Sequence, residues 1–185
     1  MPKLVFVTQN LNKISDAQKL FPDIEIDHIN FDVPEIQSLD TREIVEYKLK
    51  YAYEKIKTPC FVMDTALSLD CLNGFPGPFI KWYYEKSVGA EKTCQIAQLF
   101  NQFGCQFTTT LGYFDGENTH FITETVEGQI SNEPRGTNGY HWDIIFVPKG
   151  ENRTFAEMTF EEKQSFAVTN KIFKRFREIL IDFKS

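Results

Sequence analysis

The sequence predicts an α/β fold with a mixed β-sheet, on three observations. Short, continuous apolar runs at residues 3–8 and 60–66 are typical of buried strands. Segments with helical spacing follow each of these runs along the chain. Two segments of alternating polarity, 106–114 and 120–130, flank the turn sequence DGEN and predict a hairpin. Because a hairpin is antiparallel and strand–helix–strand crossovers are parallel, the sheet should contain both kinds of pairing.

The remaining elements follow in order. Residues 12–21 should form a helix that places Ile14, Ala17 and Phe21 on one face. Asp40 or Thr41 can cap a second helix. The other expected elements are an extended segment at 24–36, the second helix at 42–56, helices at 78–88 and 90–103, a strand at 141–148, and a long amphipathic helix that begins with the capping-box pair Thr159 and Glu162 and runs to about Phe183.

Residues 1–185 are enough for one well-packed globular domain or for two lobes that share a sheet, and a single domain with two lobes is expected. Hydrophobic residues make up 42% and charged residues 25% of the chain, which is ordinary for such a domain. The formal net charge of −6 argues against binding to duplex nucleic acid. The four cysteines show no zinc-ligand spacing, and no apolar run is long enough for a signal peptide or a membrane span, so a cytoplasmic protein with reduced thiols is expected.

The first candidate site follows the first strand, where Thr8, Asn10 and Lys13 lie in a polar loop that leads into a helix. A helix N-terminus with a nearby lysine suits a phosphate group. The alternative is a loop with a capping asparagine and a solvated lysine, because the glycines of a Walker loop are absent.

The second candidate is a pair of acids, Glu35 and Asp64, each of which stands where an extended segment is expected to stop. A hard divalent ion on a polyphosphate needs only one or two carboxylates, because water and phosphate oxygens complete its shell. Ligands of α/β sheets bind at the carboxyl ends of strands. Two ordinary loop acids that cap helices are the alternative.

Two further stretches could contribute to a nucleotide site. Gly74 to Pro78 predicts a tight turn that leads to Lys81 and Trp82, where the alternative is a rigid turn with core aromatics. In residues 134–146, a glycine-containing loop precedes Trp142 and Asp143. The tryptophan could stack on a base, and the carboxylate could accept hydrogen bonds from ring N–H groups.

Taken together, these residues resemble the inosine triphosphate pyrophosphatase family, also called Ham1, over nearly the whole chain. The shared motifs are T-x-N-x-x-K at Thr8, Asn10 and Lys13, VPEIQ with Glu35, MDTAL at residues 63–67, the specific run LNGFPGPFIKW at 72–82, and PRGTNGYHWD at 134–143.

The resemblance implies a long twisted mixed sheet flanked by helices, in two lobes with a central cleft, and a homodimer. It implies hydrolysis of non-canonical purine triphosphates such as ITP, dITP and XTP to the monophosphate and pyrophosphate, with Mg²⁺, or Mn²⁺ in its place. Carried over by position, Glu35 and Asp64 would hold the metal, and Asp64 and Lys13 would be catalytic. The substrate would be bound by Thr8, Asn10, Lys13, Lys48, Thr65, Lys81, Tyr140, His141, Trp142, Asp143 and Lys163.

The chain departs from the family pattern at three places. Met63 stands where the family has a glutamate, which removes an acid from the metal region. Residues 167–169, Ala-Val-Thr, stand where the family has Ser-His-Arg, which reads the purine 6-oxo group. His141 stands where the family has a glycine beside the base.

These departures leave three hypotheses open. The first is a pyrophosphatase for non-canonical purine nucleotides. The second is the same reaction with altered or relaxed base preference. The third is a non-catalytic relic that binds a nucleotide or a protein partner.

Overall fold

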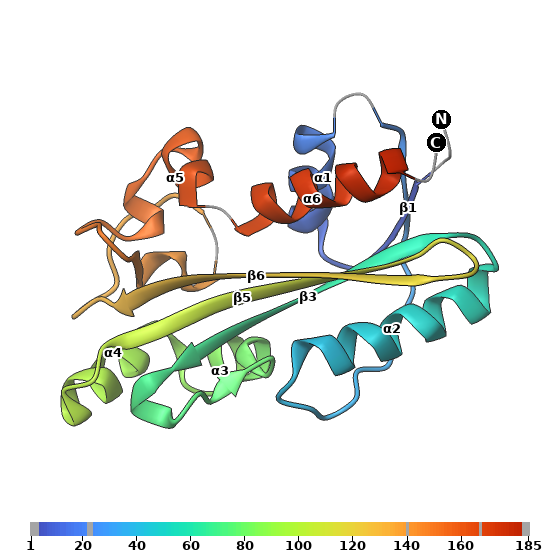
Figure 1. Ribbon diagram of the computed structural model, residues 1–185. Coiled ribbons are helices and arrows are strands. Elements are labelled where there is room, and N and C mark those ends of the chain that lie inside the picture. The colour runs from blue at the N-terminus through green and yellow to red at the C-terminus, as the bar shows by residue number, and fades with distance from the viewer. Residues whose placement is uncertain (1–3, 22–23, 140, 167, 183–185) are drawn as a thin grey trace. The chain divides into compact units, whose positions relative to one another are not determined.

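The computed structural model describes residues 4–21, 24–139, 141–166 and 168–182. A mixed seven-stranded sheet runs through them in the order β2-β1-β3-β5-β6-β7, with β4 paired to β3 (Figure 1). Strand β1 pairs in parallel with both β2 and β3, and β6 pairs antiparallel with β7. The prediction of an α/β fold with a mixed sheet is therefore confirmed.

The strands are Leu4–Val7 (β1), Ile26–Ile29 (β2), Cys60–Leu69 (β3), Pro76–Gly77 (β4), Gly104–Phe114 (β5), Thr119–Ile130 (β6) and Phe146–Pro148 (β7). The α-helices are Leu11–Leu20 (α1), Thr41–Ile56 (α2), Ile80–Lys86 (α3), Gly89–Phe100 (α4), Phe160–Phe166 (α5) and Val168–Asp182 (α6). Short 3₁₀ helices lie at Asp70–Leu72 (η1), His141–Ile144 (η2) and Phe155–Glu157 (η3).

Several elements differ in extent from the sequence prediction. The helices expected at 78–88 and 90–103 are Ile80–Lys86 and Gly89–Phe100. The segment 24–36 is a strand only at Ile26–Ile29. The strand expected at 141–148 is the 3₁₀ helix η2 followed by the three residues of β7. The single C-terminal helix is two helices, α5 and α6, and its expected end at Phe183 lies outside the described residues.

Another difference concerns Asp64, which was expected at the end of its strand. Strand β3 continues to Leu69, so Asp64 lies in its middle and the prediction is wrong. The strand continues because Ala66, Leu67 and Leu69 are buried, and because Leu67 pairs with Gly77 of β4.

Several local predictions are confirmed. Asp40 caps α2 by accepting a hydrogen bond from the Arg42 N–H at 2.7 Å. Thr159 and Glu162 form the expected capping box, with bonds of 2.8 and 3.2 Å. The hydroxyls of Thr108 and Thr110 bond those of Thr125 and Thr123, respectively, as the antiparallel register of a hairpin requires.

The chain divides into two compact units, each considered by itself. Unit 1 contains residues 1–64, 109–124 and 169–185, and unit 2 contains residues 65–108 and 125–168. Whether the chain is one domain with two lobes stays a prediction.

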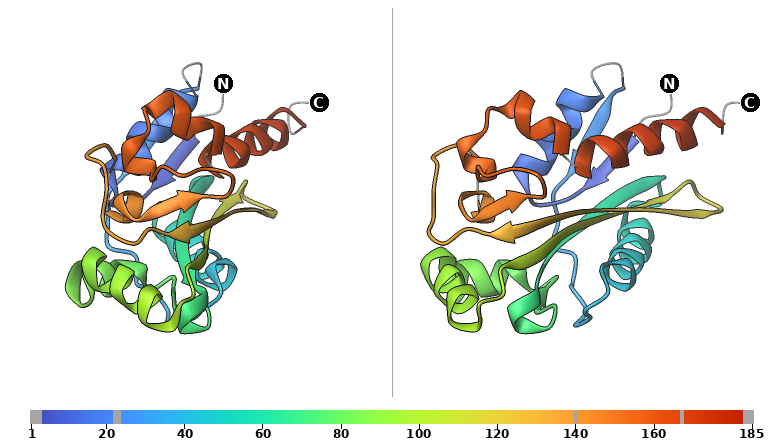
Figure 2. Two further views of the ribbon diagram at one scale, coloured as in Figure 1. Left: turned by 90° about the vertical axis from the view of Figure 1, so that its left-hand side faces the viewer. Right: turned by 60° about the vertical axis from the view of Figure 1, so that its left-hand side comes forward.

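In unit 1, helices cover both faces of the strands (Figures 1 and 2). Val45, Leu49 and Ala52 of α2 pack in one hydrophobic cluster with Val5 and other residues of β1 and β3. The opposite face is aromatic, in a chain that contains 18 phenylalanines. There Phe6 stacks on Phe61 at 4.2 Å between ring centroids, and Phe176 of α6 lies 5.2 Å from Phe61.

In unit 2, one cluster joins α3 and α4 to the strands. Its fully buried members include Leu67 and Leu69 of β3, Ala97 of α4, and Phe146 of β7. All four cysteines of the chain are buried free thiols, as expected for reduced cysteines. Burial raises the pKa of the Cys60 thiol to about 12.

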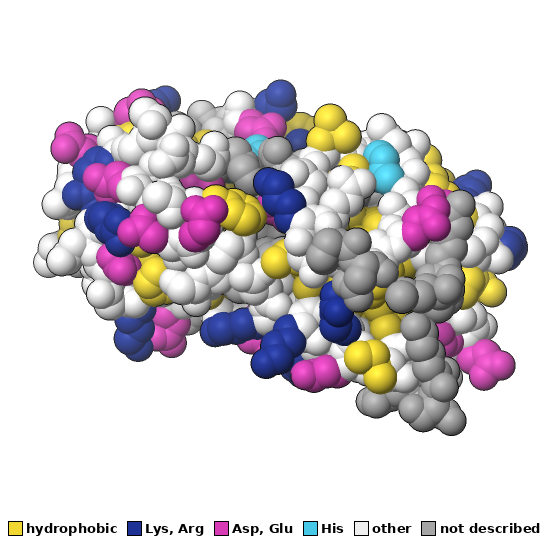
Figure 3. Space-filling view, turned by 90° about the horizontal axis from the view of Figure 1, so that it is seen from above, with side chains coloured by type: hydrophobic (Ala, Val, Ile, Leu, Met, Phe, Trp, Pro, Cys, Tyr) yellow, Lys and Arg dark blue, Asp and Glu magenta, His cyan; other side chains and the backbone are white. Residues whose placement is uncertain are grey.

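The surface mixes charges of both signs. Figure 3 shows acidic and basic side chains interspersed on the face that it draws, in keeping with 26 acidic and 20 basic residues in the chain. No helix among the described residues is long and apolar enough to cross a membrane.

The aromatic face of unit 1 provides the first prediction. Phe176 is fully buried against Phe61 and Tyr113, so Phe176→Ala should lower the free energy of unfolding by about 3–5 kcal/mol in urea denaturation. Ile181 lies on the same helix and is 55% exposed, so Ile181→Ala should change the free energy of unfolding by less than about 0.5 kcal/mol. Equal losses in the two variants would contradict this description of the core.

Candidate active site

The loop after β1 is held by its own polar groups. The Asn10 N–H donates to Thr8 Oγ1 at 3.1 Å, and the Lys13 N–H donates to Asn10 Oδ1 at 3.4 Å. The carbonyl of Thr8 is 2.7 Å from His28 Nε2. The loop leads from β1, which ends at Val7, into α1, which begins at Leu11. Lys13 therefore lies in the first turn of α1, as the sequence predicted.

Three site residues of unit 1 meet at one ammonium group. Lys48 Nζ donates to Glu35 Oε1 at 2.5 Å and to Asp64 Oδ1 at 2.7 Å. The side chains of Lys48 and Asp64 are only 11% and 13% exposed, whereas that of Glu35 is 58% exposed. Glu35 lies between β2 and α2, outside any strand or helix. The structure thus brings together two acids that are 29 positions apart in the sequence.

The second lysine of this group binds the backbone beside Asp64. Lys13 Nζ donates to the carbonyl oxygen of Met63 at 3.1 Å. The Met63 side chain, which replaces the acid expected there, is 7% exposed and belongs to the core. Lys13, Glu35, Lys48 and Asp64 form what we call the lysine–acid cluster.

The two lysines of this cluster have shifted pKa values of opposite direction. Burial lowers the pKa of Lys13, and the charge of Lys48 lowers it further, while the attraction of Asp64 and Glu35 is too weak to compensate. Burial alone would also lower the pKa of Lys48, but its bonds and charge interactions with Asp64 and Glu35 outweigh it and raise that pKa. Lys48 is therefore a firmly charged partner of the two acids.

The donor set fits a magnesium ion that is also bound by phosphate. Two carboxylates from separate segments point at one position, and Mg²⁺ in nucleotide sites takes one or two carboxylates with water and phosphate oxygens. Among the described residues there is no group of three or more His, Cys, Asp or Glu side chains that could hold a metal on its own. A metal here would need ligands beyond the carboxylates of Glu35 and Asp64.

The base-site candidates lie in unit 2, on η2 and α5. Asp143 of η2 is buried and forms an ion pair with Lys163 of α5, with 2.5 Å between Oδ2 and Nζ. The Lys163 ammonium also lies 5.1 Å above the centre of the Phe155 ring. Gly139 approaches Asp143 so closely that a Cβ at this position would lie 2.2 Å from Oδ2, and its φ of +81° also requires glycine.

His141 and Trp142 are held beside this pair. His141 adopts a left-handed conformation with φ of +55°, and its carbonyl accepts a 2.8 Å bond from the Tyr84 hydroxyl. Its Nδ1 is 3.1 Å from Glu85 Oε1. Burial, with smaller effects of Glu91, Cys94 and Asp143, raises the pKa of Tyr84 to about 12, so the phenol keeps the proton that it donates.

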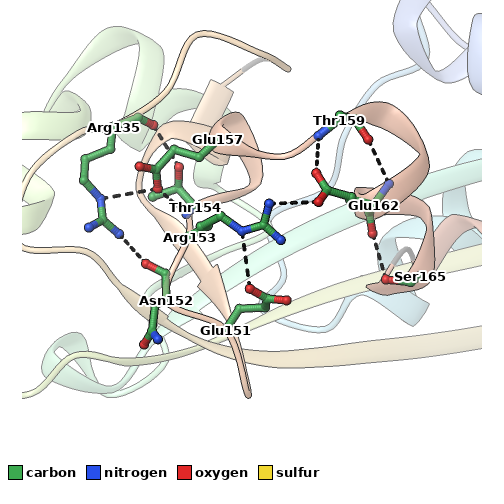
Figure 4. Close-up of polar contacts among 9 residues, drawn as sticks. All are labelled: Arg135, Glu151, Asn152, Arg153, Thr154, Glu157, Thr159, Glu162 and Ser165. Carbon is green, nitrogen blue, oxygen red and sulfur yellow. Dashed lines mark hydrogen bonds and ion pairs between the residues drawn. The ribbon is translucent and has the colours of Figure 1, made fainter.

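A polar network fixes the loop that precedes η2 to the segment that carries Lys163 (Figure 4). The Arg135 guanidinium contacts Glu157 Oε2 at 3.5 Å and donates to the Asn152 carbonyl at 2.8 Å. Thr154 donates to the Arg135 carbonyl at 2.8 Å and forms a capping box with Glu157. Arg153 then bonds Glu162 at 2.9 Å, one residue before Lys163.

The other residues predicted for the site include Lys81 and Thr65. Lys81 lies exposed on α3, after a turn in which Gly74 and Gly77 have positive φ values. Thr65 is half-buried on β3, next to Asp64. Tyr140 lies outside the described residues, as does Ala167, whose neighbour Val168 is buried at the start of α6.

Sequence reasoning missed the partners that hold these residues. Tyr84 and Glu85 carry no pattern that links them to His141, and the bonds of Lys48 to both acids depend on tertiary structure. The capping box at Thr154 and Glu157 could have been found, because T-x-x-E is its ordinary sequence signature.

Comparison with known proteins decides the family. Residues 4–179 match the Ham1 family. The chain belongs to the Ham1 family.

Relatives of this Ham1 chain cover nearly its whole length. It is 35% identical over 176 residues to a dITP/XTP pyrophosphatase of Thermococcus kodakarensis, covering 94% of this chain and 95% of that one. It is 38% identical over 170 residues to an inosine triphosphate pyrophosphatase of Schizosaccharomyces pombe, covering 89% and 88% of the two chains. The structure of a Ham1 protein from Coxiella burnetii, 24% identical, matches with a TM-score of 0.84 over 98% of this chain and all of that one, which shows the shared fold.

The buried pair of unit 2 provides the second prediction. Lys163→Met would leave the Asp143 carboxylate, 7% exposed, without its cation, and should lower the free energy of unfolding by about 3 kcal/mol. Lys149 forms a similar contact with Glu127 at 2.6 Å, but both side chains are exposed, so Lys149→Met should have little effect. Urea denaturation of both variants checks this, and equal effects would contradict a structural role for the Asp143 pair.

The third prediction follows from the lowered pKa of Lys13. Between its folded-state pKa and the ordinary value of 10.5, the unfolded chain holds more protons at Lys13 than the folded protein does. The free energy of unfolding of the wild type should therefore rise with pH in this window, relative to that of Lys13→Met. Urea denaturation at several alkaline pH values measures the difference. If the free energy of unfolding of the wild type, relative to that of Lys13→Met, fell as the pH rises, the Lys13 charge would stabilise the folded protein, contrary to this prediction.

Proposed function

We propose that this chain hydrolyses nucleoside triphosphates to the monophosphate and pyrophosphate, with non-canonical purines such as ITP, dITP and XTP as preferred substrates. The proposal rests chiefly on the lysine–acid cluster in a member of the Ham1 family. The names of the relatives from Thermococcus kodakarensis and Schizosaccharomyces pombe support the reaction and the class of base.

The lysine–acid cluster has the groups that this reaction needs. Attack at the α-phosphorus forms a bond to the oxygen of water and breaks the bond between that phosphorus and the oxygen bridging to the β-phosphate. Lys13 supplies positive charge to the phosphates, and Lys48 adds a second ammonium. The Asp64 carboxylate orients the attacking water and accepts its proton.

Magnesium, or manganese in its place, belongs to the proposal. Glu35 and Asp64 would hold the ion, which supplies Lewis-acid stabilisation of the phosphate oxygens and of the leaving pyrophosphate. Lys13 and Lys48 would remain necessary, because a triphosphate carries more negative charge than one divalent ion neutralises. The homodimer and the cytoplasmic location expected from the sequence are also part of this proposal.

The groups proposed for the base are those of η2 and α5. Trp142 offers an aromatic surface, and the Asp143 carboxylate, oriented by Lys163, can accept hydrogen bonds from base N–H groups. His141 is proposed to line the same base site, where the family has a glycine. Lys81, Thr65 and Tyr140 are proposed as further substrate contacts.

The fourth prediction tests reaction and residue together. Purified protein with Mg²⁺ should release pyrophosphate from ITP and XTP faster than from ATP or GTP. Asp64→Asn should lower the rate at least about a hundredfold, because it removes a proton acceptor in the reaction. Glu46→Gln, at an exposed acid of α2 that pairs with Lys50, should leave it unchanged.

Each result bears on a different part of the proposal. Absence of pyrophosphate release from every nucleotide, together with nucleotide binding by calorimetry, would leave only a binding protein. Equal rates on ATP and ITP would reject the purine preference and favour altered base specificity. Full activity of Asp64→Asn would reject the role assigned to Asp64.

A further inference from the structure

The position between the two proposed metal ligands is taken by a side chain of the protein. Lys48 Nζ is 2.5 Å from Glu35 Oε1 and 2.7 Å from Asp64 Oδ1. Both acids therefore accept hydrogen bonds from the same ammonium, and their two oxygens can be no farther apart than these two bonds laid end to end. Without a cation, two carboxylates at such separation repel each other.

Lys48 and Lys13 play different parts in this cluster. The Lys13 ammonium bonds the Met63 carbonyl, which is a backbone group and carries no charge to be neutralised. Lys48 bonds the two carboxylates directly and comes from α2, whereas the acids come from β3 and from the segment before α2. Lys48 thus joins three separate parts of unit 1 through charge.

A divalent ion in the position between Glu35 Oε1 and Asp64 Oδ1 needs the two oxygens that Lys48 uses. Mg²⁺ binds oxygen ligands at about 2.0–2.1 Å, which is too close for an ammonium to stay between the same two oxygens. Metal binding and the double ion pair of Lys48 are therefore alternatives. This step rests on the proposed function, because that proposal makes Glu35 and Asp64 the ligands.

We propose that Lys48 is a built-in counter-ion, which holds Glu35 and Asp64 together in the metal-free protein and must leave at least one of them when the metal binds. Glu35 is the acid that can be released, because it is 58% exposed and lies outside regular secondary structure, whereas Asp64 is 13% exposed and fixed on β3. Lys48 keeps the two acids in place when no metal is bound. Because a metal must displace it, a metal without nucleotide binds more weakly than it would without Lys48.

The same exchange couples the metal to the substrate. An ammonium that leaves a carboxylate needs a new anionic partner, and phosphate oxygens of a nucleotide can provide it. Metal and triphosphate should therefore bind more tightly together than either binds alone, and by reciprocity each strengthens the other equally. Lys48 acts in this way as a positioning residue for the metal ligands before it acts on the substrate.

The fifth prediction compares two lysines of α2 in the protein without nucleotide. Lys48→Met should bind Mn²⁺ on the order of ten times more tightly than the wild type in calorimetry, because no ammonium competes for the carboxylates. Its melting temperature without metal should be lower than that of the wild type, and Mn²⁺ should raise it more. Lys50→Met removes a charge two residues away, where Lys50 pairs with Glu46 in solvent, and should bind Mn²⁺ like the wild type.

The contrary results are specific. Equal or weaker Mn²⁺ binding by Lys48→Met, with a native circular dichroism spectrum, would overturn the counter-ion role. Equal tightening in Lys50→Met would show an effect of net charge alone and would also overturn it. If neither the wild type nor Lys48→Met bound Mn²⁺, the assignment of Glu35 and Asp64 as ligands would fall with the inference.

A second measurement on the wild type covers the case in which Lys48→Met does not fold. Acylation of lysine amines, followed by mass spectrometry, should label Lys48 several times faster with saturating Mg²⁺ than without it, while labelling of Lys50 stays constant. An unchanged rate at Lys48 would overturn the inference. Neither measurement depends on hydrolysis, so an inactive protein that shows the exchange would refute the proposed reaction and leave the counter-ion role standing.

Discussion

Two carboxylates that share one ammonium are the constraint on which unit 1 is built. Asp64 lies in the middle of a core strand, where an unpaired charge would lower the free energy of unfolding by about 3–5 kcal/mol. Lys48 removes that cost only if α2 is fixed against β3. Val45 and Leu49 provide this by packing on the strands, and the hydroxyl bond between Thr41 and Thr110, 2.8 Å long and buried, holds the first turn of the helix to β5.

Unit 2 contains a similar pair. Asp143 is more deeply buried than Asp64, and its lysine comes from a helix whose start is fixed by capping and by the Arg153–Glu162 pair. A buried carboxylate with an oriented lysine is a hydrogen-bond acceptor of set direction, which suits recognition of N–H groups. In the lysine–acid cluster, by contrast, the Glu35 side chain is exposed to solvent, which suits exchange of one cation for another.

The sequence predicted those features that local patterns determine. The buried strands, the helix that Asp40 caps and the hairpin at Asp115–Asn118 all depend on periodicity, capping and turn residues within a short window. The extent of β3 was missed because pairing of Leu67 with Gly77 continues it beyond Asp64, and this pairing is tertiary.

The candidate site could be predicted in its residue types but not in its pairings. Glu35 and Asp64 were selected as a metal pair from their chemistry and from family resemblance, and the structure does bring both to one position. That Lys48 would occupy this position could not be read from the sequence, because 13 and 16 residues separate it from its two partners. The strand expected at 141–148 is confined to β7, because His141, with φ of +55°, starts a 3₁₀ helix before it.

Met63 stands where the family resemblance predicts a glutamate, and this difference changes one feature of the cluster and leaves another intact. The bond from Lys13 uses the backbone carbonyl at this position, so it does not depend on which side chain is present. The charge balance does depend on it, because Lys13, Lys48, Glu35 and Asp64 together carry no net charge, whereas an acid in place of Met63 would add a negative one. A neutral cluster attracts a divalent ion less strongly than a negative one does. On the proposed function, the missing attraction must then come from the triphosphate, whose oxygens complete the coordination shell. This chain should therefore depend on its substrate for metal binding more than its own variant Met63→Glu does.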